Sequence, residues 1–195
     1  LQKGKTMVEA QVPWLNGLSG KVLLNKWWDS CLELEKIYSN TDPKLRVKWA
    51  GPEMSARSSI TARQMETWSH GHEVFDRLGQ IRKEGDHIKN IVHLGVSTFE
   101  WTFLNRNIQL PEIKPFISLN LPSETHISYN EQDDDNFIRG SAVEFCQVVT
   151  QVRNIDDTNL NVVGDVATSW MQYAQCFAGK PEDPPQKGTR YIQKI

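Results

Sequence analysis

The amino-acid sequence predicts an α+β protein in which a bundle of antiparallel helices is followed by a small mixed domain. Two observations support this prediction. Between residues 19 and 105 the apolar side chains recur with the 3.6-residue period of amphipathic helices. The linker "NIQLPEIKP" then ends that pattern, and the runs "FISLNL" and "THISYN" after it are typical of strands. We therefore expect a helical bundle domain at 1–108, a small α+β domain at 109–180 and a proline-rich tail at 181–195.

The first helix of the bundle is expected in "SGKVLLNKWWDSCLELEKIYSN". Its apolar residues stand at positions 23, 24, 27, 28, 31, 34 and 38, which places them on one face of a helix. The turn-forming residues "NTDP" follow and end it. Residues 1–18 contain Pro13 and two glycines and are expected to be irregular.

Two further helices complete the predicted bundle. Ser58 or Ser59 is a suitable N-cap for the second helix, and Gly79 stands where a left-handed C-terminal residue is expected. Asp86 is expected to cap the third helix, which runs through "HIKNIVHLGVSTFEWTFLNRN" to about Asn105. The connections between these helices are too long for simple hairpins.

The second half alternates short strands and helices. "FISLNL" and "THISYN" surround a Pro-Ser turn and are expected to pair as a hairpin. Ser141 and Glu144 have the spacing of a capping box, which predicts the start of a helix in "SAVEFCQVVTQV". "NLNVVG" is expected to be a strand, and "DVATSWMQYAQCFAG" a closing helix that ends at Gly179. The tail, with three prolines, is expected to lie on the surface or to be disordered.

Composition excludes several classes of protein. The net charge of −2 gives no electrostatic footprint for nucleic acid or for an anionic membrane, so neither is expected as a partner. The apolar runs are too short to span a bilayer. The three cysteines are widely spaced and include no Cys-x-x-Cys pair, which favours a reducing, cytoplasmic compartment. Because the chain begins with "LQKGKT", without methionine or signal peptide, we expect it to start inside a longer protein.

The candidate metal ligands are Glu66 and His70 in "METWSHG". Four residues apart on a helix, a carboxylate and an imidazole project from one face and can bind one divalent ion. Oxygen and nitrogen donors suit zinc, iron, nickel or manganese. Glu73 lies on the same stripe and could orient the His70 ring by accepting its second N–H. The alternative is a solvated stripe in which Arg63 and Glu66 form an ordinary surface pair.

The remaining histidines give weaker signals. His72 is two residues from His70 and points elsewhere on a continuous helix. His93 lies in the apolar segment "IVHLGV" and is expected to be a core residue. His87, at a helix start, is expected to be exposed, and His126 falls in the predicted hairpin. These spacings contain no Ser-His-Asp or Cys-His arrangement, and the glycines form no phosphate-binding loop.

Several segments of this sequence resemble one family. "WAGPEMSARSSITARQMETWSHGHEVFDRLG", "GSAVEFCQVVTQVRN" and "WMQYAQCFAGKP" are similar to bacterial metal-binding proteins related to mycothiol-dependent maleylpyruvate isomerase, in the DinB-like helical bundle superfamily. The resemblance spans about residues 18–181. It implies an N-terminal helical bundle, a smaller α+β domain, and one metal ion held by Glu66, His70 and a histidine from an early helix.

That third histidine is absent from this sequence. No histidine precedes His70, so either the ligand lies upstream of Leu1 or this protein has lost it. We expect the first alternative, in which the bundle lacks its first helices here. Its open seam would then be an apolar surface that needs a partner, with a homodimer among the expected forms.

The resemblance implies a metal-dependent enzyme that uses a low-molecular-weight thiol. Zinc is the first expectation for the metal, and a thiol-dependent isomerase or transferase for the activity. A thiolate would add to an activated double bond, allow rotation and leave, while Arg57 or Arg63 could pair with a substrate carboxylate. Two alternatives remain: a metal-stabilised module that binds a small molecule or protein without turnover, and a metal-free remnant that acts as an assembly subunit.

Overall fold

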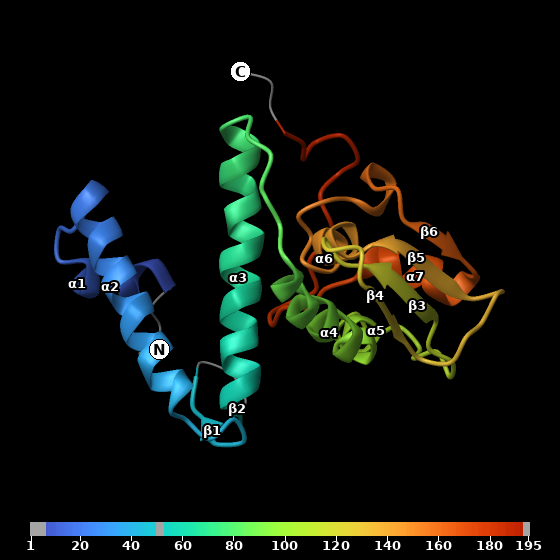
Figure 1. Cartoon of the computed structure of the whole chain (residues 1–195), viewed down its shortest axis with the longest axis horizontal. Helices are drawn as coiled ribbons and strands as arrows, with labels where there is room; N and C mark the ends of the chain where they lie inside the picture. Colours follow the sequence, from blue (N-terminus) through green and yellow to red (C-terminus); the bar gives the residue numbers. More distant parts are fainter. Residues whose placement is uncertain (1–6, 50–52, 193–195) are drawn as a thin grey trace. The chain divides into compact units, whose positions relative to one another are not determined.

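The computed structural model describes residues 7–49 and 53–192, and its contacts divide the chain into two compact units, Leu1–Ile60 and Thr61–Ile195. Helix α3, Ala56–Arg77, begins in the first unit and has most of its length in the second. Within the described residues, seven α-helices accompany one two-stranded and one four-stranded sheet (Figure 1). This mixture confirms the predicted α+β class.

The first unit contains two helices and a small sheet. These are α1 (Met7–Leu15), α2 (Gly20–Ser39), and the antiparallel strands β1 (Arg46–Val47) and β2 (Met54–Ser55). Helix α2 begins after Ser19 and ends before Asn40, as predicted. The irregular structure expected for residues 1–18 is wrong for the part occupied by α1, while residues 1–6 lie outside the described residues. Helix α1 ends where the chain turns left-handed, with φ of 41° at Asn16 and 74° at Gly17.

Helix α3 starts three or four residues earlier than the sequence predicted. The cap is Ser55, whose hydroxyl oxygen accepts a hydrogen bond from the backbone N–H of Ser58 at 3.1 Å. Ser58 and Ser59 therefore lie inside the first turn, and neither is the N-cap. At the other end Gly79 has a φ of 65°, which confirms the predicted left-handed residue after the helix.

The single helix predicted from Asp86 to Asn105 is wrong, because the segment is broken into three pieces. These are the 3₁₀ turn η1 (Asp86–Ile88), α4 (Lys89–Ser97) and α5 (Phe99–Asn105). The break falls at Thr98, whose hydroxyl donates to the carbonyl oxygens of Leu94 and Gly95 and so competes with the helical pattern. Asp86 does not cap the segment; its carboxylate accepts hydrogen bonds from the backbone N–H and hydroxyl of Ser123.

The four-stranded sheet of the second unit has the order β4-β3-β5-β6. Its strands are β3 (Phe116–Asn120), β4 (His126–Tyr129), β5 (Phe137–Ser141) and β6 (Asn161–Val163). Strands β3 and β4 form the predicted hairpin, and β6 is the predicted strand in "NLNVVG". Strand β5 was not predicted; it pairs parallel with β3 and antiparallel with β6, and so completes the sheet.

Helices α6 (Ala142–Val149) and α7 (Asp165–Tyr173) follow β5 and β6 respectively, with the 3₁₀ turn η2 (Ile155–Asp157) between them. The Ser141 hydroxyl caps α6 by accepting from the backbone N–H of Val143 at 3.2 Å, as predicted. Glu144 does not close the capping box. Its carboxylate instead accepts from the backbone and side-chain N–H groups of Asn159.

One hydrophobic core joins the helices and the sheet of the second unit. Helix α4 contacts α6 and helix α5 contacts α7, and buried apolar residues of all four belong to one cluster. Gly95 permits the close approach of α4 and α6, since a Cβ atom there would come within 2.9 Å of Val149. The compact units meet at Ile60.

A buried ion pair fastens α3 to this core. The two terminal nitrogens of Arg153, just beyond α6, each donate to one carboxylate oxygen of Asp76 at 2.7 Å. Both side chains are only 10% exposed, and the pairing is bidentate. Among the described residues, no helix is both long and apolar enough to cross a membrane.

Replacement of Arg153 by alanine is expected to destabilise the protein by about 3–5 kcal/mol, because it leaves the Asp76 carboxylate buried and unpaired. Urea unfolding monitored by circular dichroism measures this loss. The matched control is Asp134→Ala, which breaks the exposed pair with Arg139 and is expected to cost less than about 1 kcal/mol. Equal effects of the two substitutions would contradict this role of the ion pair.

Candidate functional site

The candidate site lies along one stripe of α3. Glu66, His70 and Glu73 are spaced by four and three residues, so the helix presents them together. The Nε2 nitrogen of His70 lies 3.5 Å from a Glu66 carboxylate oxygen, and its Nδ1 nitrogen lies 3.5 Å from a Glu73 oxygen. The side chains of Glu66 and His70 are 55% and 73% exposed, so both donors are open to an incoming ion or ligand.

This stripe forms one wall of a cleft of about 380 Å³ within the second unit. The opposite wall comes from the end of α6 and from the chain beyond α7. Four carboxylates, one imidazole and one guanidinium line the cleft. The lining residues are Met65, Glu66, Ser69, His70, Glu73, Thr150, Gln151, Phe177, Glu182, Asp183, Pro185 and Arg190.

The guanidinium of the cleft belongs to Arg190, in the tail that was expected to lie on the surface or to be disordered. Arg190 forms an ion pair with Glu73 across 117 residues of sequence. This contact, joined by the weaker influence of His70, holds the pKa of Glu73 below its usual value of 4.5 despite partial burial. Glu73 is therefore a carboxylate anion at neutral pH.

The two arginines selected from the sequence do not line this cleft. Arg63 is exposed on α3, and Arg57 belongs to the first unit. Arg190 was missed because proline-rich tails give no periodic signal that could place a side chain against a distant helix.

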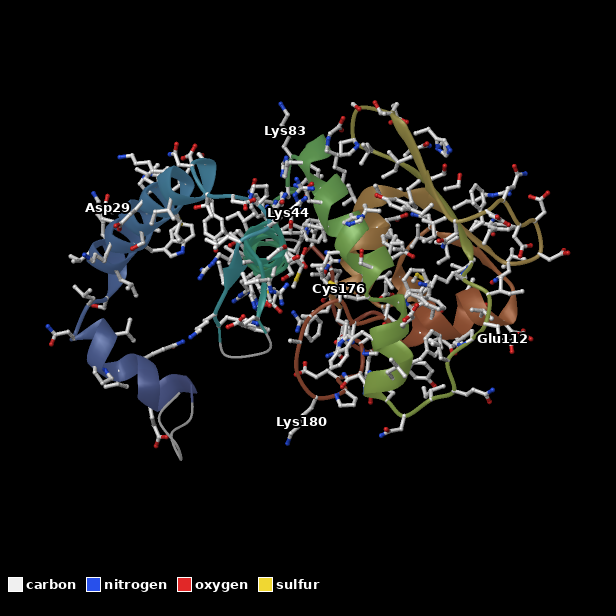
Figure 2. The ribbon with its side chains drawn as sticks, turned by 90° about the horizontal axis from the view of Figure 1, so that it is seen from below. Asp29, Lys44, Lys83, Glu112, Cys176 and Lys180 are labelled. Atoms are coloured by element: carbon white, nitrogen blue, oxygen red, sulfur yellow. The ribbon has the colours of Figure 1, made fainter. Side chains whose placement is uncertain are left out.

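The cysteines near the site are buried. Figure 2 shows Cys176 in the interior of the second unit, whereas Lys180 points outward. Burial, with a smaller effect of the Glu66 carboxylate, raises the pKa of the Cys176 thiol far above its usual range. Burial likewise raises the pKa of Cys146. Neither side chain can supply a thiolate at neutral pH.

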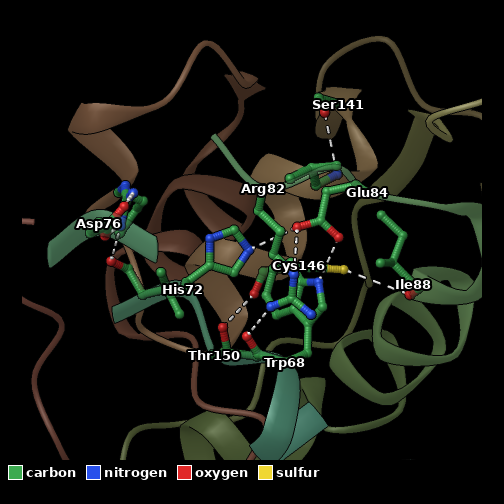
Figure 3. A network of polar contacts seen from close by, with 12 residues as sticks. Trp68, His72, Asp76, Arg82, Glu84, Ile88, Ser141, Cys146 and Thr150 are labelled. Atoms are coloured by element: carbon green, nitrogen blue, oxygen red, sulfur yellow. Dashed lines mark hydrogen bonds and ion pairs between the residues drawn. The ribbon is translucent and has the colours of Figure 1, made fainter. Parts of the chain in front are cut away.

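His72 points away from His70, as predicted, into a buried polar network (Figure 3). Its Nε2 nitrogen lies 3.1 Å from Glu84, whose other carboxylate oxygen accepts a 2.9 Å hydrogen bond from the indole N–H of Trp68. Arg82 lies 3.4 Å from Glu84 and donates to the Trp68 carbonyl at 2.7 Å. Burial raises the pKa of Glu84, but His72, Trp68 and Arg82 outweigh it and bring the pKa below its usual 4.5.

The other histidines lie outside the cleft. His93 was expected in the core, but it is exposed, because the apolar face of α4 is formed by Ile91, Val92 and Gly95. His87 is exposed as expected, and His126 lies in the hairpin strand β4.

Glu66 and His70 fit a divalent ion as a partial ligand set. Their donor atoms are the oxygen and nitrogen that such ions accept, and these atoms lie 3.5 Å apart. Across residues 7–49 and 53–192, no group of three or more His, Cys, Asp or Glu side chains is arranged to hold a metal ion. The described part of the chain thus supplies a pair of donors at this position.

The α3 side of this site lies in a segment that is similar to a known family. Residues 1–75 match the family described as Mycothiol maleylpyruvate isomerase N-terminal domain. The matched segment includes Glu66, His70 and Glu73, whereas the opposite wall of the cleft lies beyond it.

Two curated relatives match a longer stretch. Both are uncharacterized proteins of Mycobacterium tuberculosis, from strains CDC 1551 / Oshkosh and ATCC 25618 / H37Rv, and each is 42% identical over 137 residues. The match covers 70% of this chain and 53% of each relative, so the chain spans about half the length of the curated relatives it matches. No solved structure matches the chain significantly.

The lowered pKa of Glu84 predicts a pH-dependent contribution to stability. A carboxyl whose pKa is lower in the folded state stabilises the protein above its unfolded pKa, and this contribution disappears as the pH falls through the folded value. The difference in unfolding free energy between wild type and Glu84→Gln is therefore expected to be largest near pH 7 and to shrink below about pH 4.

Urea unfolding at a series of pH values measures this difference. Glu112→Gln is the matched control, since Glu112 is exposed and lies outside the network. A Glu84→Gln difference that stays constant between pH 7 and pH 3 would show that the charge of Glu84 contributes nothing.

Proposed function

We propose that this maleylpyruvate isomerase-like chain binds a divalent metal ion through Glu66 and His70, with zinc as the first expectation. The observation that supports the proposal is the pairing of these two side chains, 3.5 Å apart and open to a cleft, in a segment that matches the family. A bound divalent ion would lower the pKa of a thiol or water at this position, as it does in other metal sites.

We further propose a thiol-dependent isomerase or transferase activity, with the thiol supplied by a low-molecular-weight cofactor. The protein's own buried thiols near the cleft stay protonated at neutral pH, so a thiolate there must arrive with a ligand. In an isomerisation the thiolate adds to an activated double bond, the resulting single bond rotates, and elimination restores the double bond and the thiolate.

The residues of the cleft have separate roles in this proposal. Glu66 and His70 hold the ion, and Glu73 accepts from the second ring nitrogen of His70. Met65 and Phe177 provide apolar surface for the carbon skeleton of a ligand. Arg57 and Arg63, which do not line the cleft, remain the candidates that the sequence offers for a substrate carboxylate.

A non-catalytic, metal-stabilised binding module is the second candidate. It requires protein ligands beyond Glu66 and His70, because a structural metal site is closed by about four protein donors. A site closed by further protein ligands would leave no position for a thiol and would serve structure alone.

Metal content is the first test. The protein, expressed at the full length that its gene encodes, is expected to contain about one equivalent of zinc or another divalent ion by elemental analysis. Glu66→Ala and His70→Ala are each expected to lose it. His93→Ala, which removes an exposed helical histidine outside the cleft, should retain it. A folded wild-type protein without metal would overturn the proposal.

Thiol binding separates the enzyme from the binding module. A thiol that coordinates the ion is deprotonated, so its binding to the zinc-loaded protein is expected to release about one proton at pH 7. Calorimetric titration with cysteine in buffers of different ionisation enthalpy measures this release. Binding without proton release, or no binding of cysteine and of larger thiols, would favour the non-catalytic module.

A further inference from the structure

The C-terminal strap, residues 180–192, is held in place by a series of hydrogen bonds although it contains no helix or strand. Its partners lie in the segments that follow α6 and α7. The side chains of Gln151 and Asn154 donate to the carbonyl oxygens of Glu182 at 2.7 Å and Pro185 at 2.8 Å, respectively. The backbone N–H groups of Glu182 and Gly188 donate to the side chains of Gln175 at 3.0 Å and Asp157 at 2.9 Å. The strap therefore has a defined path along the cleft.

At the end of this path Arg190 contacts the stripe of α3 that carries Glu66, His70 and Glu73. Its guanidinium pairs with one carboxylate oxygen of Glu73, and the other oxygen of Glu73 lies 3.5 Å from His70 Nδ1. His70 Nε2 in turn lies 3.5 Å from Glu66. Arg190, Glu73, His70 and Glu66 thus form a continuous row in which each charged or polar group faces the next.

The contact with Glu73 determines which ring nitrogen of His70 is left to bind a metal. A carboxylate that accepts from Nδ1 fixes the ring and leaves Nε2 free to bind a metal on the side of Glu66. Glu73 is 45% exposed and on its own would sample several rotamers. The Arg190 guanidinium, attached to an anchored strap, restricts it to one.

We propose that Arg190 is a positioning residue of the metal site, which holds Glu73 so that Glu73 orients His70 for coordination through Nε2. The inference rests on the proposed function, because it assigns the metal to Glu66 and His70. It makes the C-terminal strap a part of the site, although the strap lies far outside the segment that matches the family.

Considered as a positive charge alone, Arg190 would weaken metal binding, whereas a positioning role would strengthen it. A guanidinium near a cation site repels the cation, and it also occupies a carboxylate that could itself become a ligand. If charge alone mattered, removal of Arg190 would strengthen metal binding. If Arg190 acts by positioning, its removal weakens metal binding, so the sign of the change separates the two.

The test is the affinity of the full-length protein for Zn²⁺, measured by competition with a chromogenic chelator. Arg190→Ala is expected to bind zinc about tenfold more weakly, in the range seen when a contact behind a metal ligand is lost. Arg190→Lys should recover part of the affinity. In Glu73→Ala the further change Arg190→Ala should have no effect, because the two residues act through one contact.

Lys187→Ala is the matched control. It removes a positive charge from the same strap, where Lys187 lies 3.7 Å from Asp156 and does not contact Glu73. Its zinc affinity is expected to stay within about twofold of wild type, since both groups of that pair are exposed. Equal or tighter zinc binding by Arg190→Ala would overturn the proposal, as would an equal loss in Lys187→Ala.

The metal-free protein provides a second readout. Nitrogen-15 spectra of the His70 imidazole are expected to differ between wild type and Arg190→Ala, because removal of the guanidinium frees the Glu73 carboxylate that faces Nδ1. Identical spectra would contradict the positioning role. If wild type binds no zinc, the proposed function fails, and these spectra alone decide whether Arg190 orients the ring.

Discussion

The buried ion pair between Asp76 and Arg153 is the contact on which the candidate site depends. Trp68, His72 and Asp76 lie four residues apart along α3 and form its buried stripe in the second unit. The bidentate bond from Arg153 fixes the rotation of the helix at one end of this stripe, and the bond from Trp68 to Glu84 fixes it in the middle. Because the helix cannot rotate about its axis, Glu66, His70 and Glu73 must face the cleft.

The side chains that line the cleft carry more negative than positive charge, which favours the binding of a cation. Carboxylates outnumber the single guanidinium, which is itself paired with Glu73. The thiols beside it are kept neutral by burial and are protected from oxidation by the same burial.

The family match covers only one wall of the cleft. The segment that matches the family supplies the stripe on α3, while residues beyond it supply the opposite wall and the strap. The two mycobacterial relatives are about twice as long as the segment that they share with this chain.

The sequence by itself determined the α+β class, the helix from Gly20 to Ser39, the β3–β4 hairpin, the Ser141 cap and the spacing of Glu66 and His70. These features follow from local periodicity and from hydrogen bonds between near neighbours, which a few consecutive residues encode. Only the tertiary structure decided the pairing of β5, the exposure of His93 and the contact of Arg190 with Glu73. Each of these depends on segments far apart in the chain, whose meeting is set by the packing of the core and leaves no local pattern in the sequence.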